Sequence, residues 1–231
     1  MQRIERGGMD IEQIIELERA RRDCYKLLAA SFYQPQKKLF LDENLYESLG
    51  TMLTRVCPEA APFSEKMATT VRQYSDEDLL VEYARLFVGP NELLAPPYGS
   101  IYLEEGRKVM GDSTARVMEF YRAEGLSMDE HFENLPDHIA VELEFMYYLA
   151  YNEVEALENN DREKAGHFAD RQEAFLRTFL GPWIVPFCEK MKQGTENRFY
   201  HALADCLSVF ISKTNYRDVM PEELTTRLAR T

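Results

Sequence analysis

The chain has 231 residues, of which 45% are hydrophobic, enough for a substantial core in one large domain or two small ones. With 40 acidic and 27 basic residues its formal net charge is -13, which argues against nucleic acid or an anionic membrane as the main partner and would attract a basic one. No stretch approaches the roughly 20 apolar residues that span a bilayer, and the first residues lack the apolar centre of a signal peptide.

Apolar residues recur at helical spacing along almost the whole chain, and alternating runs of β-branched residues are missing. This periodicity predicts an all-α protein. The expected helices cover 9–33, 42–56, 62–73, 75–89, 113–124, 136–158, 161–179, 182–192 and 196–213, with a short terminal helix after 215. Because no internal repeat or low-complexity linker separates them, we expect a single-domain helical bundle of about nine to ten helices over residues 1–231, with a possible hinge at 127–136.

Local patterns predict how some of these helices begin and end. Ser75 and Asp78 have the spacing of a capping box, in which each side chain bonds the other's backbone amide. Gly181-Pro182 is expected to break a helix, because proline removes a backbone donor. Trp183, the sole tryptophan, follows this break, and we expect it to pack in the core.

The stretch VGPNELLAPPYGSIY, residues 88–102, interrupts the helices because its three prolines and two glycines disfavour helical structure. It is unusually apolar for a loop, and apolar side chains need to be buried. The apolar side chains are Leu93, Leu94, Tyr98, Ile101 and Tyr102. Two interpretations stay open: the loop packs on the bundle as a plug, or it lines a groove for an apolar ligand or peptide.

The stretch LPDHIAVELEFM, residues 135–146, begins a strongly apolar helix. Pro136 suits the first turn, and Asp137 beside it could cap backbone amides. His138 and Glu142 lie four residues apart, next to the apolar face.

Several roles fit His138 and Glu142. A metal site would need three or four protein ligands, and nothing nearby supplies the rest. Acid-base catalysis by His138 is chemically feasible, but the chain has no nucleophile elbow, phosphate loop or HExxH motif. The remaining roles are a structural cap, or a polar patch at the mouth of a groove, where Asp137 would accept hydrogen bonds from a cationic or amide-rich ligand.

The four cysteines are scattered along the chain and form no CxxC pair. They are Cys24, Cys57, Cys188 and Cys206. This spacing does not indicate a zinc site, and we expect reduced, buried thiols in a cytoplasmic protein without a cofactor.

Three stretches, EYARLFVGPNELLAPPYGSIY, LPDHIAVELEFM and FLRTFLGPWIVPF, occur in this order within residues 20–212 and together resemble the TorD/DmsD/NarJ family of redox-enzyme maturation chaperones. The resemblance implies a cytoplasmic, all-α, non-enzymatic protein. Such a chaperone binds an apo-molybdoenzyme subunit, often by its twin-arginine leader peptide, until the cofactor is inserted. It is a monomer or a domain-swapped dimer. Alternatives are a nitrate-reductase-type assembly chaperone whose client subunit is not exported, and a metal-binding helical protein.

Carried over by position, the resemblance implies a peptide-binding set but no catalytic or metal-binding residue. The set is Tyr83, Leu86, Phe87, Gly89, Pro90, Pro96, Pro97, Tyr98, Ser100, Tyr102, Asp137, His138 and Glu142. In the third stretch the family often has His-Leu-x-x-Trp, whereas this chain has Phe179 in place of the histidine, so any role of that histidine is absent.

A twin-arginine leader is a basic segment followed by an apolar stretch, so its receptor needs an apolar groove edged by acidic groups. The loop at 88–102 could supply the groove. The candidate acids are Glu104, Glu105, Asp112, Asp137 and Glu142. In this hypothesis Asp137 and His138 form a polar lip at an exposed helix end and orient the basic part of the peptide.

Overall fold

Helices make up nearly all the regular structure in the computed structural model, which describes residues 10–89, 93–106, 109–127 and 134–214. They are α1 (Ile11–Ala30), α2 (Lys37–Asp42), α3 (Leu45–Val56), α4 (Ala61–Thr70), α5 (Asp76–Tyr83), α6 (Ser100–Leu103), α7 (Asp112–Ala123), α8 (Ile139–Glu158), α9 (Arg162–Phe175), α10 (Gly181–Gly194) and α11 (Arg198–Lys213). Among the described residues there is no strand, and an isolated antiparallel bridge pairs Tyr98 with His138. The prediction of an all-α bundle is confirmed.

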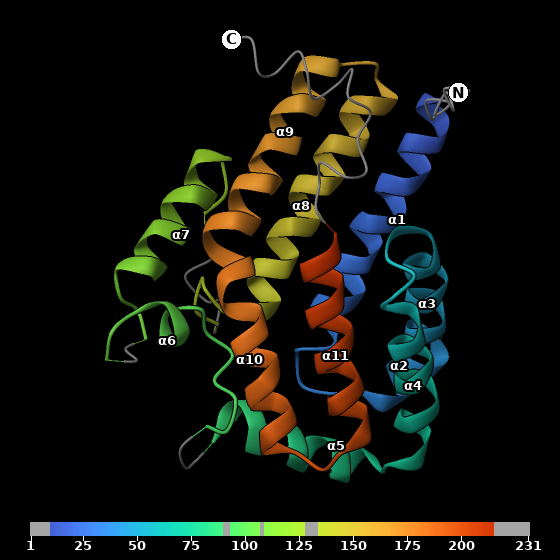
Figure 1. Cartoon of the computed structure of the whole chain (residues 1–231), viewed down its shortest axis with the longest axis vertical. Helices are drawn as coiled ribbons and strands as arrows, with labels where there is room; N and C mark the ends of the chain where they lie inside the picture. The colour runs from blue at the N-terminus through green and yellow to red at the C-terminus, as the bar shows by residue number, and fades with distance from the viewer. Residues whose placement is uncertain (1–9, 90–92, 107–108, 128–133, 215–231) are drawn as a thin grey trace, which may run out of the picture.

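The long helices run roughly along the axis of the bundle (Figure 1). α1 packs along α8, α8 along α9, and α10 along α11. α3 and α4 cover α1 and α11 on one flank, and α7 lies on the opposite flank. α5 crosses one end of the bundle, where α10 ends and α11 begins (Figure 1).

Aromatic rings hold the outer segments on the core. The rings of Phe32, Phe87 and Phe187 meet pairwise at centroid distances of 6.0, 5.8 and 6.1 Å, in tilted or edge-on contacts that suit aromatic pairs. Phe120 on α7 lies 5.4 Å from Phe175 on α9. Phe87 and Phe120 thereby fix the chain after α5 and the outer helix α7 in place.

The predicted capping box is confirmed. The Ser75 hydroxyl accepts the Asp78 amide, and the Asp78 carboxylate accepts the Ser75 amide, both at 3.0 Å. Two short helices were not predicted, α2 with six residues and α6 with four. Neither is long enough to show helical periodicity, and α6 begins inside the stretch expected to be a loop.

The predicted helix break at Gly181-Pro182 is wrong. A π-helical turn at Leu176–Leu180 joins α9 directly to α10, and Pro182 sits in the first turn of α10. A β-carbon on Gly181 would lie 2.6 Å from the carbonyl oxygen of Leu176. Glycine therefore permits the wider turn, which accommodates the proline without ending the helix.

Some predictions concern residues outside the described ranges. They are the terminal helix after 215, residues 128–133 of the expected hinge, and Pro90 of the expected peptide-binding set. None of the described helices is long and apolar enough to cross a membrane.

Candidate functional site

The loop after α5 is joined to the start of α8 by backbone hydrogen bonds. Gly99 N–H donates to the carbonyl of Asp137 at 2.8 Å, and Ile139 N–H donates to the carbonyl of Pro97 at 2.9 Å. We call residues 97–100 and 137–139 the junction. It brings together the two motif stretches from which the peptide-binding set was drawn.

Asp137 lies inside the junction with 1% of its surface exposed. Its Oδ2 accepts the backbone N–H of Ser100, the first residue of α6, at 2.8 Å. The prediction that Asp137 caps the following helix is wrong, because α8 begins at Ile139 and the carboxylate bonds a distant amide instead. Pro136 likewise precedes α8 and does not lie in its first turn.

His138 is the N-cap of α8, with its Nδ1 accepting the Ala140 N–H at 3.2 Å. Burial lowers the pKa of His138 to about 4, so the ring is neutral near pH 7 and can accept this bond. The Tyr98 ring lies edge-on to it at 5.4 Å. The expected exposed lip is therefore corrected: Asp137 and His138 are both buried.

Glu142, one turn further along α8, is fully buried and accepts the indole N–H of Trp183 at 3.1 Å. Burial raises the pKa of Glu142 well above its usual value, and the nearby Asp137 raises it further, whereas the bond from Trp183 lowers it. Gly99 passes close by, since a β-carbon there would lie 3.0 Å from the indole nitrogen. The sequence placed Trp183 in the core but did not reveal this bond.

Tyr102 completes the contact between the loop and α10. Its ring stacks on Trp183 at 5.6 Å, and its hydroxyl donates to the carbonyl of Pro96 at 2.9 Å. Pro97 and Ser100 are buried, while Pro96 and Tyr98 are half-buried. The described part of the loop thus packs on the bundle over much of its length, as the plug interpretation predicted.

The members of the expected peptide-binding set that lie on α5 and the turn after it are also largely internal. α5 continues as a π-helical turn at Ala84–Val88, on which Leu86 and Phe87 are buried. The Tyr83 hydroxyl donates to the carbonyl of Phe32 at 3.3 Å. Gly89 follows with φ of 92°, a conformation that favours glycine. These residues anchor the segment to the core. The apolar side chains that the segment exposes are Leu80, Val81 and Val88, which are not members of the expected set.

The candidate acids after α6 have separate environments. Glu104 caps α7, because its Oε1 accepts the backbone N–H of Ser113 at 2.7 Å and the hydroxyl of the same residue at 2.5 Å. Glu105 and Asp112 are exposed. No three histidine, cysteine or acidic side chains among the described residues lie close enough together to hold a metal ion.

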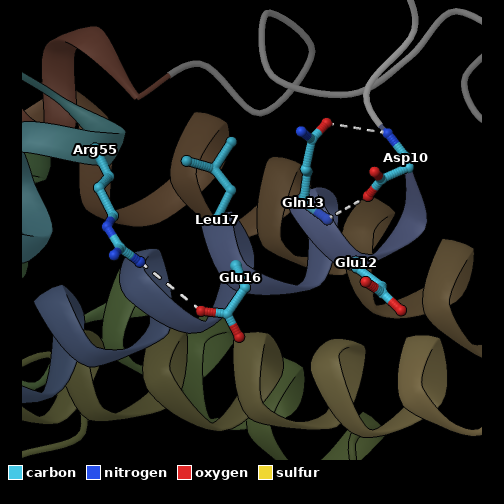
Figure 2. A pocket seen from close by; sticks show the side chains of 6 residues that line it. All are labelled: Asp10, Glu12, Gln13, Glu16, Leu17 and Arg55. Carbon is cyan, nitrogen blue, oxygen red and sulfur yellow. Dashed lines mark hydrogen bonds and ion pairs between the residues drawn. The ribbon is translucent and has the colours of Figure 1, made fainter.

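A shallow hollow of about 590 Å³ lies at the start of α1, and the sequence did not indicate it. Figure 2 shows its lining, Asp10, Glu12, Gln13, Glu16, Leu17 and Arg55. Asp10 and Gln13 bond each other in a capping box, and Glu16 pairs with Arg55 at 3.7 Å (Figure 2). The hollow shares no residue with the junction.

Residues 30–189 match the family model described as nitrate reductase delta subunit. The chain is 28% identical over 201 residues to the chaperone protein TorD of Shewanella sp. (strain MR-4), covering 82% of this chain and 90% of that one. It is 27% identical over 140 residues to a Haemophilus influenzae protein named probable Tat proofreading chaperone DmsD. That alignment covers 61% of this chain and 62% of the relative, so the chain spans about three fifths of the relative's length.

A solved structure shows the same architecture. It is a crystal structure from Archaeoglobus fulgidus described as that of a redox enzyme maturation protein. It has a TM-score of 0.52 and 27% sequence identity, and covers 83% of this chain and 94% of that one.

Proposed function

The chain belongs to the TorD/DmsD/NarJ family, whose model is described as nitrate reductase delta subunit, and on that premise we propose that it is a maturation chaperone and not an enzyme. Its client is the apo form of a molybdopterin oxidoreductase subunit. The chaperone binds the client's twin-arginine leader in the cytoplasm, before export, and holds the subunit until the cofactor is inserted. The names of the TorD and DmsD relatives support this role.

The observation that carries the proposal is that the motif side chains at the junction form internal hydrogen bonds. Asp137 holds the Ser100 amide, neutral His138 caps α8, and Glu142 accepts the indole N–H of Trp183. These buried groups fix the loop on α8 and α10, which is the work of a scaffold that presents a surface. A general base would instead need reach to a substrate proton.

Part of the proposed binding set acts from inside the protein. The internal residues, Leu86, Phe87, Asp137, His138 and Glu142, position the loop and the end of α5. The net charge of -13 favours the approach of the basic half of a leader, and this attraction weakens as salt screens it.

Calorimetric titration of the purified chain with a synthetic twin-arginine leader tests the proposal. The control peptide carries lysine in place of both arginines and keeps the net charge and the apolar stretch. We expect saturable one-to-one binding that is weaker for the control, because lysine cannot form the two-pronged bond of arginine with a carboxylate. Absence of saturable binding to either peptide would overturn leader recognition.

The family model is described as nitrate reductase delta subunit, which favours a nitrate reductase as an alternative client. In this alternative the client is a catalytic subunit that carries no exported leader. Co-expression separates the two clients. A chaperone of this second type would copurify with a client subunit whose twin-arginine leader is absent, whereas a leader-binding chaperone would lose the client when its leader is deleted.

A further inference from the structure

Four large apolar side chains are exposed on α5, the π-helical turn after it and the loop. Val81 is 54% exposed and Val88 62%, while Leu80 and Leu94 are each 41% exposed. On the same helical segment Leu79, Leu86 and Phe87 face the core. The segment is therefore apolar on both sides, and we call the outer residues Leu80, Val81, Val88 and Leu94 the α5 strip.

Contacts at the end of α10 bring the loop part of the strip beside the helical part. Ala95 N–H donates to the carbonyl of Leu86 at 3.0 Å. A β-carbon on Gly194 would lie 2.9 Å from Cβ of Leu94 and 3.1 Å from Cδ2 of Leu86. Arg85 donates to the carbonyl of the same glycine at 3.1 Å. Leu94 and the π-helical turn thus meet over the last residue of α10.

The charges around the strip are arranged in order along α5. Exposed Asp76, Glu77 and Asp78 occupy the first turn, and the apolar residues follow. Arg85, four positions after Val81 and three before Val88, is paired with Glu82 at 2.8 Å. Exposed carboxylates therefore precede the α5 strip along the helix, and Arg85 within the apolar part is paired with Glu82.

We infer that the α5 strip is the docking surface for the client leader, with the basic residues against Asp76 and Glu77 and the apolar stretch over Val81, Val88 and Leu94. This inference rests on the proposed function and specifies its binding surface. The order of acidic and then apolar groups matches a segment that is basic and then apolar. Burial of the strip by such a segment would also remove exposed apolar side chains from water.

The test compares leader affinities of wild type, the double variant Val81→Ser/Val88→Ser and the control Val185→Ser. Val185 is an exposed valine on α10, nine positions before Gly194. All three substituted sites are exposed, so folding should persist, and unchanged melting curves check this. We expect affinity to fall about tenfold for each valine lost from the strip and to stay unchanged in the control.

A second pair of variants tests the acidic end. Glu77→Gln should weaken the dependence of leader affinity on salt concentration, because one screened charge contact is removed, whereas Glu163→Gln in the first turn of α9 should not.

The outcomes separate the inference from the function that it rests on. If wild type binds the leader and the double variant binds equally well, the α5 strip is not the docking surface although leader recognition stands. If wild type binds no leader, both fail. If wild type forms a concentration-dependent dimer that the double variant does not form, and leader affinity is the same in both, the α5 strip is a contact between two copies of the chain and the inference is overturned.

Discussion

The carboxylate of Asp137 accepts the backbone N–H of Ser100 at 2.8 Å, across 37 positions of the sequence. Both residues are buried, so water cannot replace either partner of this bond. The bond fixes the start of α6 against the start of α8. Because α6 ends the loop that carries the exposed Leu94, the position of this loop on the bundle depends on the internal carboxylate.

Asp137→Ala should destabilise the protein by about 1–3 kcal/mol, because it leaves the Ser100 amide buried without an acceptor. Denaturant unfolding measures this loss. The matched control is Asp161→Ala, which removes an exposed N-cap whose carboxylate accepts the Lys164 amide at 3.0 Å. That change should cost about 0.5–2 kcal/mol.

The two costs overlap, so hydrogen exchange provides the discriminating measurement. Asp137→Ala should speed exchange of the Ser100 amide and lower leader affinity, whereas Asp161→Ala should do neither. Unaltered protection of Ser100 in the first variant would contradict the proposed anchoring role.

His138 should make stability depend on pH on the acid side. Its pKa is about 4 in the folded protein and about 6.5 when unfolded, so the unfolded chain binds the proton more tightly. Stability is therefore lost as pH falls from about 6.5 towards 4, at up to about 1.4 kcal/mol per pH unit. His138→Asn keeps a capping side chain and removes the titration. Between pH 7 and pH 5 the free energy of unfolding should therefore fall less for His138→Asn than for wild type. An equally large fall in the variant would refute the role of His138.

Glu142 should act with the opposite sign. Its pKa is raised in the folded protein, so its contribution is complete below about pH 4.3, where the unfolded chain is also protonated, and is lost as pH rises. Glu142→Gln keeps an acceptor for the Trp183 indole but cannot ionise. Its stability relative to wild type should therefore grow between pH 4 and pH 8. A difference that stays constant over this range would show that Glu142 does not titrate in this way.

The fold was predictable because long apolar periodicities report helices directly. The errors arose where a distant partner decided the local structure. Pro136 and Asp137 look like the start of a helix in sequence, but the Ser100 amide competes for the Asp137 carboxylate, and His138 takes over as the cap. A contact between residues this far apart leaves no periodic pattern in either segment.

The sequence predicted which residues make up the candidate site better than it predicted whether their side chains are exposed. The resemblance drew attention to Asp137, His138 and Glu142, whose polarity suggested a surface location. Their burial depends on Gly99 lying close to Trp183 and on the loop covering α8. The helix before the loop shows the reverse: Leu79 and Leu80 are adjacent and equally apolar, but only Leu79 of the two is buried.

The π-helical turn before α10 leads to a final prediction. Gly181→Ala should destabilise the protein, because its new β-carbon would lie 2.6 Å from the carbonyl oxygen of Leu176, a backbone atom that cannot move aside alone. We expect a loss of at least about 1 kcal/mol from strain. The control is Gly50→Ala in α3, where the β-carbon would meet only the Ser64 side chain at 3.6 Å.

An alanine at position 50 should stabilise the protein by about 0.5–1 kcal/mol, since glycine within a helix is entropically unfavourable. Thermal unfolding of the two variants should therefore shift the melting temperature in opposite directions. If Gly181→Ala were neutral or stabilising, α9 and α10 would have to be joined by an ordinary α-helical turn, and the explanation of how the helix continues through Pro182 would be wrong.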